Sequence, residues 1–370
     1  MKIRLVYTHY ISGHNIEYVH HLYEGAQKDL SNHYVFAVPE EFEIQKQQME
    51  WKQSNNVAFH YIGNAASVDG NILSKAWKNC RRLKKAVRSC HADEVILITL
   101  IDFVPFLQLM MPEKVKVKGI LYRIYLYYLP EMDFIHRMIE KVKMYVITHS
   151  KCIESVLILN DKKGAQRLNS LWKTEKYSYL PDPCVLMEKS SIRNMREELN
   201  IAMDKTIVLH IGSINYDKGF DRIFNMIDNT KESELANFCF IFAGKVSEGC
   251  KELFYAMLGK SKTKANILVM DEFLPYDVMG SLVYTADKVV LPYRRFGQSS
   301  GIIAYCAQMK TPVYVPDKGL IYHLVKQYGI GTGVSDFTDI HSLDCSCITN
   351  SSYVDSHRIE DFYNTILDIR

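Results

Sequence analysis

Residues 286–331 constrain the fold of this chain more than any other stretch. Residues 288–291 form a short apolar run closed by a proline, which indicates a fully buried strand. After a polar loop, a Ser-Ser-Gly tripeptide opens the apolar segment 302–308, which is typical of a helix that starts on a serine cap. Residues 313–315 predict the next buried strand. This succession of strand, loop, helix and strand predicts a parallel α/β sheet.

The Ser-Ser-Gly tripeptide indicates an anion site. A helix that begins at the carboxyl end of a parallel strand directs free N–H groups and the positive end of its dipole at the ligand-binding edge of the sheet. Gln298, Ser299, Ser300 and Gly301 are therefore candidates to bind a phosphate. The plain alternative is an ordinary serine cap on a crossover helix, which is the commoner structure.

A second motif follows residues 207–211, which predict another buried strand. Gly212 and Ser213 come directly after it, and Lys218 with Gly219 then opens a helix. Gly212 allows the backbone to approach a ligand closely, and Lys218 supplies a mobile positive charge near the helix start. This arrangement is a phosphate loop in the broad sense, although a surface lysine at a helix start is the simpler interpretation.

Short strands alternate with helices in the N-terminal half as well. Strands are predicted at residues 3–7, 34–38, 57–62, 95–100, 116–122 and 144–148, and helices at 16–30, 71–88 and 134–141. The alternation predicts a doubly wound, mostly parallel sheet with right-handed crossovers.

The domain boundary is predicted from two prolines in three residues, at 181 and 183, because proline interrupts regular structure. The composition then turns polar before a second strand–helix series begins. We expect two doubly wound, Rossmann-like domains. The first covers residues 1–183, a linker covers 184–203, the second domain covers 204–352, and a final helical segment covers 353–370.

These motifs resemble those of the GT-B glycosyltransferases, in particular the retaining family 4 (group 1) enzymes. The resemblance rests on the pair Ala286-Asp287, the strand ending at Pro292, the Ser-Ser-Gly helix start and Pro312-Val313, in this order, together with Lys218-Gly219. It extends over essentially the whole chain. It implies that the two Rossmann-like domains face each other across a cleft. The N-terminal domain would bind the acceptor, the C-terminal domain would bind the nucleotide sugar, and the last helix would return to the N-terminal domain.

The resemblance also implies roles for individual residues. Lys218 would hold the donor diphosphate and is the catalytic candidate, and backbone groups around Phe273 and Leu274 would bracket the base. The implied donor-binding set is Gly13, Gly212, Ser213, Lys218, Phe273, Leu274, Gln298, Ser299, Ser300 and Gly301. Two features depart from the family pattern. The places of its glutamate pair fall near Gly297 and Tyr305, and Ser213 stands where an arginine is usual.

Acceptor-side candidates lie in the N-terminal half. In the family, the loop that contains Gly13 faces the donor phosphate across the cleft. His9, Asp102 and His149 are the candidates on this side, because histidine titrates near neutral pH and carboxylates share acid/base work with it. For the histidines, an ordinary hydrogen-bonding role in a loop or core is the simpler alternative.

We expect a glycosyltransferase of hexosyltransferase type that moves a sugar, with retention, from a nucleotide-sugar donor to a glycan or lipid-linked glycan acceptor, in surface polysaccharide synthesis. A sugar-nucleotide epimerase of the same fold and a catalytically silent partner or glycan-binding subunit remain alternatives. We expect no cofactor and no essential metal, because the sequence has no Asp-x-Asp pair suited to a metal-bridged diphosphate.

Charge is distributed unevenly. Residues 1–185 hold 25 Lys+Arg and 19 Asp+Glu, a net charge of +6, and the rest holds 20 and 23, a net charge of −3, which together give the formal +3. Within the helix 71–88, Arg81, Arg82, Lys84 and Lys85 predict contact with an anionic membrane surface, unless they form only a solvated face. We expect no nucleic-acid partner, because no recognised binding motif occurs.

The sequence also bears on location. The nine cysteines form no C-x-x-C pair, and no apolar run approaches the ~20 residues of a membrane span. The first residues read as a strand and not as a signal peptide. These features predict a cytoplasmic protein, with peripheral attachment to the inner face of the membrane as an extension of that prediction.

Overall fold

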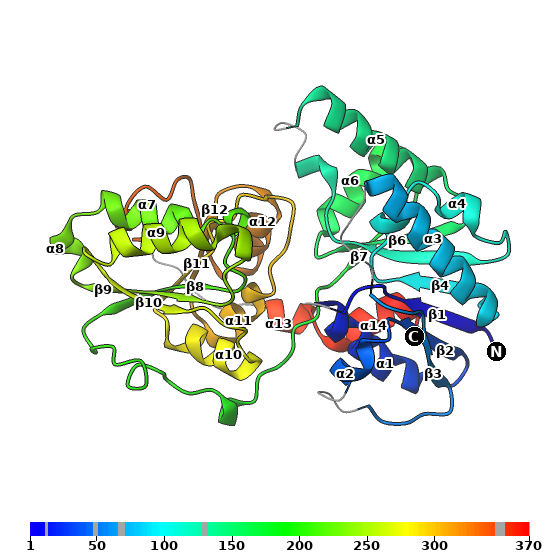
Figure 1. Ribbon diagram of the computed structural model, residues 1–370, viewed down its shortest axis with the longest axis horizontal. Helices are drawn as coiled ribbons and strands as arrows, with labels where there is room; N and C mark the ends of the chain where they lie inside the picture. The colour runs from blue at the N-terminus through cyan, green and yellow to red at the C-terminus, as the bar shows by residue number, and fades with distance from the viewer. Residues whose placement is uncertain (12–13, 47–50, 66–70, 128–131, 345–351, 370) are drawn as a thin grey trace. The chain divides into compact units, whose positions relative to one another are not determined.

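The computed structural model describes residues 1–11, 14–46, 51–65, 71–127, 132–344 and 352–369. The chain forms two compact units. Unit 1 consists of Met1–Pro183 together with Arg358–Arg370, and unit 2 consists of Cys184–His357. Each unit is built on one parallel sheet with helices packed against it (Figure 1). The doubly wound α/β class predicted from the sequence is confirmed in both units.

The sheet of unit 1 has seven parallel strands in the order β3-β2-β1-β4-β5-β6-β7. The strands are β1 Ile3–Tyr7, β2 His33–Val38, β3 Val57–Tyr61, β4 Glu94–Leu97, β5 Lys116–Leu121, β6 Ile153–Leu159 and β7 Tyr177–Leu180. The helices are α1 His14–Lys28, α2 Phe42–Lys46, α3 Ile72–Ser89, α4 Leu107–Met110, α5 Phe134–His149, α6 Lys162–Trp172 and α14 Ile359–Leu367.

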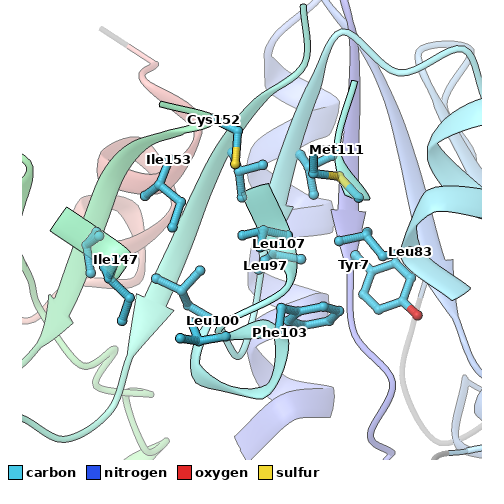
Figure 2. Packing of buried hydrophobic residues seen from close by; sticks show 14 of the residues in the cluster. Tyr7, Leu83, Leu97, Leu100, Phe103, Leu107, Met111, Ile147, Cys152 and Ile153 are labelled. Carbon is cyan, nitrogen blue, oxygen red and sulfur yellow. The ribbon is translucent and has the colours of Figure 1, made fainter. Parts of the chain in front are cut away.

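Alternate residues of β1 enter two separate hydrophobic cores, one on each face of this sheet. Leu5 and Tyr7 pack with residues of α3, α4, α5 and α6, whereas Val6 packs with residues of α1 and α14. Figure 2 shows part of the first core, where Tyr7 lies beside Leu83 of α3 and beside Phe103, which follows β4. Because helices cover both faces, the central strands are mostly apolar, with Arg4 on β1 and Lys118 on β5 as buried exceptions.

The strand predicted at residues 144–148 is wrong, because these residues belong to the long helix α5. Their β-branched residues favour a strand locally. Asp133, however, caps the helix by accepting a hydrogen bond from the His136 N–H at 2.9 Å. Met144 and Ile147 are then buried on one face of the helix. The strand that pairs with β5 is β6, which begins later.

Two buried cations hold the end of α14 against the sheet of unit 1. Arg4 on β1 donates hydrogen bonds to Glu94 at 2.6 Å, to Asp368 at 3.1 Å and to the carbonyl of Leu367. Lys118 on β5 also pairs with Asp368. Burial disfavours the charge of Arg4, but the hydrogen bond and charge of Glu94 outweigh burial and raise its pKa. The helix that follows unit 2 in the chain is thereby fixed in unit 1.

The sheet of unit 2 has six parallel strands in the order β10-β9-β8-β11-β12-β13. The strands are β8 Thr206–Ile211, β9 Phe238–Ala243, β10 Asn266–Met270, β11 Lys288–Val290, β12 Val313–Pro316 and β13 Gly331–Val334. The helices are α7 Phe220–Asn229, α8 Glu232–Leu235, α9 Lys251–Ser261, α10 Tyr276–Thr285, α11 Ile302–Met309, α12 Gly319–Tyr328 and α13 Tyr353–Ser356.

Residues 184–203, which the sequence predicts to be a linker, are part of unit 2 and pack on it. The backbone N–H of Met195 donates to the Thr285 hydroxyl at 2.9 Å, and the Arg196 guanidinium lies 2.8 Å from the Asp287 carboxylate. Polar groups of this segment thus contact α10 and the loop that follows it. The segment 353–370 is also divided, since α13 lies in unit 2 and α14 in unit 1.

We expect Arg4→Met to destabilise unit 1 by about 3 to 5 kcal/mol, because it leaves the Glu94 carboxylate with little solvent and without its charge partner. All three tryptophans lie in residues 1–183, so tryptophan fluorescence during urea denaturation reports on unit 1. Lys2→Met is the matched control, since Lys2 is exposed on the same strand end. Equal urea midpoints for the two variants would contradict the role assigned to Arg4.

Candidate functional site

The winding of the unit 2 sheet reverses between β8 and β11. From β8 the chain adds β9 and then β10 on one side, and it returns to add β11 on the other side of β8. In open parallel sheets, ligands bind at the carboxyl ends of the strands that flank such a reversal. The loop with Lys218 follows β8, and the loop with the Ser-Ser-Gly tripeptide follows β11. Both motifs therefore meet at one place.

Two glycines shape the loop after β8. Gly212 has φ of +106° and Gly219 has φ of +77°, in the region that favours glycine. A Cβ on Gly219 would lie 2.1 Å from the carbonyl oxygen of Pro292, so no other residue fits there. Between them, the Asn215 side chain accepts a hydrogen bond from the Lys218 N–H at 3.1 Å. This loop is thus packed directly against the loop after β11.

An aromatic side chain links Lys218 to the Ser-Ser-Gly tripeptide. The Lys218 ammonium lies 3.8 Å from the centre of the Tyr293 ring, which is a cation–π contact. The Tyr293 hydroxyl lies 3.0 Å from the Ser300 hydroxyl and shares a hydrogen bond with it. Tyr293 is buried, whereas Lys218 is half-buried. The contact holds the ammonium at the edge where α11 begins.

The serine cap predicted for this helix is wrong in detail. The N-cap residue of helix α11 is Gly301, which has φ of −60° and no side chain with which to cap it. The Ser300 carbonyl accepts a hydrogen bond from the Ile303 N–H at 3.1 Å, but the Ser300 hydroxyl bonds to Tyr293. A buried phenol needs a polar partner, and this need takes the hydroxyl away from the cap. Gln298 and Ser299 are half-exposed on the same loop.

The two arginines of this loop carry carboxylate partners. The Arg294 guanidinium donates to both oxygens of Asp221, at 2.7 and 2.5 Å, and its pKa is raised by this hydrogen bond. Arg295 lies 2.6 Å from the Asp217 carboxylate and is partly exposed. The positive charge of Arg294 is therefore neutralised locally, and the pair ties this loop to Asp221 in the first turn of α7. Ser213, in the family's arginine position, is exposed.

Phe273 and Leu274 lie farther from Lys218. They follow β10, which is the second strand from β8 in the sheet, about 10 Å away at the usual strand spacing. Phe273 is 87 % exposed, and Leu274 is half-buried. A nucleotide is long enough to span this separation with its base at one strand end and its diphosphate at another.

A buried histidine lies beneath this site. His210 on β8 has one ring nitrogen, Nδ1, 3.0 Å from the Val290 carbonyl oxygen of β11. Burial is the main cause that lowers the pKa of His210 to about 4, and the nearby charge of Lys218 adds to it. The imidazole is therefore neutral at physiological pH. Neither His210 nor Tyr293 was predicted as a site residue from the sequence. A lone histidine inside an apolar strand gives no signal of a site. Tyr293 could have been found, because it is the aromatic residue directly after Pro292.

Unit 1 has a corresponding reversal between β1 and β4, and His9 and Asp102 follow these two strands. His9 Nε2 lies 3.3 Å from Asp102 Oδ2, within ion-pair distance, although neither atom has a hydrogen-bond partner among the described residues. Only 1 % of the His9 surface is exposed, against 24 % of the Asp102 side chain. Burial, with the Asp102 carboxylate, raises the pKa of Tyr10 beside them to about 12.

His149 is not part of this group, which corrects the position predicted for it. It is the last residue of α5, a helix that runs from the end of β5 back to the start of β6. It therefore lies toward the amino ends of the strands, whereas His9 and Asp102 lie at the carboxyl ends. Its ring stacks on Tyr145 at 4.0 Å, which gives it a structural role. Gly13 falls outside the described residues.

Solved structures of similar architecture include GT-B glycosyltransferases, and the chain has the GT-B fold. No family model matches the sequence, and no curated protein matches it significantly. HepE from Anabaena, in complex with UDP and glucose, has a TM-score of 0.67 with 12 % identity over 100 % of this chain and 96 % of that one. WaaG, a glycosyltransferase involved in lipopolysaccharide biosynthesis, gives 0.63 with 14 % identity over 99 % and 90 %. Sucrose-phosphate synthase from Thermosynechococcus elongatus gives 0.65 with 12 % identity over 99 % and 94 %.

The pKa of His210 predicts a pH-dependent stability. In the unfolded chain its pKa is near 6.5, and in the fold it is about 4, so only the unfolded state takes up a proton between these values. Stability is therefore lost as the pH falls from 6.5 toward 4, by about 2 kcal/mol at about pH 5. His210→Gln keeps a donor for Val290 but does not titrate. We expect circular dichroism during urea denaturation to show a smaller acid-induced loss in this variant than in the wild type. An equal loss in both proteins would argue against a depressed pKa.

Proposed function

We propose that this protein is a glycosyltransferase that moves a hexose, with retention, from a nucleotide-sugar donor to a glycan or lipid-linked glycan acceptor in surface polysaccharide synthesis. The observation that carries the proposal is the meeting of Lys218 with the start of α11 at the reversal between β8 and β11. A half-buried ammonium, a glycine-shaped loop and a helix start together suit a diphosphate better than any other common ligand.

In this mechanism the donor diphosphate binds between the loop after β8, which carries Lys218, and the loop after β11, which carries the Ser-Ser-Gly tripeptide. Lys218 neutralises the negative charge that develops on the diphosphate as the sugar–phosphate bond breaks, and the positive end of the α11 dipole adds to this stabilisation. Tyr293 keeps the ammonium in place through its ring, and its hydroxyl keeps the loop of Ser300 in place. We propose that no metal is essential, because Lys218 and the helix start supply positive charge and the sequence lacks an Asp-x-Asp pair.

Asp102 is the acceptor-side residue that the geometry of unit 1 favours. Its carboxylate is partly exposed at the reversal of that sheet, and the buried His9 lies behind it. We propose that Asp102 accepts a hydrogen bond from an acceptor hydroxyl and that His9 orients the carboxylate from below.

The comparisons support this function without identifying its substrates. HepE binds UDP and glucose in its solved structure, which makes a uridine nucleotide a reasonable first donor to assay here. A catalytically silent subunit is the second candidate. It is favoured by Ser213 in place of the usual arginine and by the pairing of Arg294 with Asp221, which together leave fewer cations for the diphosphate.

The first test is Lys218→Ala. Turnover should fall about 100-fold or more, because one such contact to a departing anion contributes ~2.7 to 4 kcal/mol to transition-state stabilisation. Lys262→Ala, which removes an exposed lysine of the same unit, is the control. Product analysis with a panel of nucleotide sugars, with and without glycan acceptors, is the measurement. Product formed without acceptor would indicate an epimerase, and no product despite nucleotide binding would indicate a silent subunit.

The second test is Gly301→Val, with calorimetric titration of nucleoside diphosphate. Residues other than glycine can adopt the backbone conformation of Gly301, so the variant should keep the fold with a modest loss of stability. The added side chain should keep the diphosphate away from the helix start and weaken binding at least about tenfold. Ser299→Ala with Ser300→Ala should weaken it less, because the backbone donors remain. Unchanged affinity in folded Gly301→Val would remove the start of α11 from the donor site.

A further inference from the structure

Helix α5 is anchored in unit 1 by its C-terminal half only. Met144, Ile147 and Thr148 are buried, and the Thr148 hydroxyl lies 2.6 Å from the Tyr177 hydroxyl of β7. The N-terminal half has no buried residue, although it is rich in large apolar side chains. Figure 1 shows the helix at the periphery of its unit. The exposed half therefore contributes little to the core and needs another explanation.

The apolar side chains of α5 form a stripe, which we define as Phe134, Ile135, Met138, Ile139, Val142 and Tyr145. Each is between 44 % and 76 % exposed. With about 100° of rotation per residue, the six positions fall within an arc of roughly 140° along about three turns of helix. Large apolar residues scattered singly over a surface are ordinary, but a continuous stripe of this length is not.

Most of the stripe faces away from the unit that carries it, and among the described residues only Tyr145 at its C-terminal end has a ring contact there, with Trp172 of α6 at 6.2 Å. On the same helical projection, Met144, Ile147 and Thr148 occupy the side of the helix opposite to the stripe. The side chains that enter the core and those of the stripe are thus separated by the helix itself. The apolar stripe is therefore not a core face left incompletely packed, and a shift of α5 toward the sheet would not bury it.

Basic side chains border the stripe on both edges. Lys141 lies beside the Phe134 edge and Lys143 beside the Ile139 edge on the helical projection. The other charged residues within the helix are Arg137 and Glu140, and Glu140 pairs with Lys143 at 2.6 Å. The helix is thus net positive, as is the whole N-terminal half of the chain. An apolar stripe with lysines at its edges matches a bilayer interface, where acyl chains meet anionic head groups.

We propose that the outward stripe of α5 lies in the interface of a membrane that contains anionic lipid. The stripe would enter the boundary between acyl chains and head groups, and the exposed Lys141 would contact the lipid phosphates. Lys143, at the opposite edge, would do so only by leaving its pair with Glu140. This goes beyond the proposed sugar transfer, because it rests on a surface of unit 1 and holds whatever the reaction is. None of the described helices combines the length and apolar character that a transmembrane span requires, so the attachment would be peripheral.

The basic residues of α3 have different roles from those that border the stripe of α5. Arg82 donates to the Ile62 carbonyl at 3.1 Å and also to the Asn64 carbonyl, so it holds the loop after β3. Lys84 is half-buried, and Arg81 and Lys85 are exposed. The cluster predicted from the sequence is therefore divided between structural and free cations. Helix α3 also exposes Ile72, Leu73 and Trp77, but only in its first two turns, whereas the longer stripe of α5 supplies the larger apolar contact that lasting attachment needs.

The test is flotation of the full chain with vesicles of phosphatidylcholine, with and without phosphatidylglycerol. We expect the wild type to float with the anionic vesicles, and Ile135→Ser with Ile139→Ser to reduce its partition coefficient at least about tenfold, because two apolar side chains no longer enter the interface. Leu171→Ser is the matched control, since Leu171 is similarly exposed on neighbouring α6. All of these positions are exposed, so thermal melting should be unchanged.

Charge variants separate the two helices. Lys141→Gln with Lys143→Gln should weaken binding to anionic vesicles severalfold and leave binding to neutral vesicles unchanged, whereas Arg81→Gln with Lys85→Gln should have a smaller effect. The proposal is overturned if the wild type floats with neither kind of vesicle, or if the serine variant floats as well as the wild type. It is equally overturned if the stripe holds two copies together, which light scattering would show as a dimer that the serine variant converts to a monomer.

Discussion

Each sheet depends on one strand that pairs in parallel on both sides while the chain reverses its winding around it. In unit 2 this strand is β8, which pairs with β9 and β11, and in unit 1 it is β1, which pairs with β2 and β4. Because all strands are parallel, the loops that follow them emerge at one edge. Residues almost 80 positions apart, such as Lys218 and Tyr293, therefore come into contact although neither motif alone specifies a site.

The fold class and the strand ends that carry Lys218, Phe273 and the Ser-Ser-Gly tripeptide could be predicted from the sequence, because apolar runs, glycines and prolines act locally. Errors arose where a distant contact overrides a local preference. The segment 144–148 has the composition of a strand but continues a helix that Asp133 caps. The segment 184–203 has the composition of a linker, yet its polar groups pair with α10 and its C-terminal loop.

The finer structure of the site could not be predicted for the same reason. The cation–π contact of Lys218 and the hydrogen bond of Ser300 both depend on Tyr293, whose side-chain direction follows from the packing of two loops. The close approach of Gly219 to Pro292 likewise involves residues from separate strand–helix units. Charge alone is also an incomplete guide, since Arg82 and Arg294 are cations that the fold itself uses, whereas the exposed stripe of α5 is apolar and lies outside the basic cluster predicted on α3.

The attachment of α14 to unit 1 has a consequence for synthesis on the ribosome. Domains generally begin to fold in the order in which they emerge. Helix α14 belongs to the core of unit 1, where Phe362 and Ile366 are fully buried, but it is translated after all of unit 2. Until then the apolar face of α1 lacks its partner, and Arg4 and Lys118 lack their contacts with Leu367 and Asp368. Unit 2 can therefore complete its core before unit 1, although its residues are made later than most of those in unit 1.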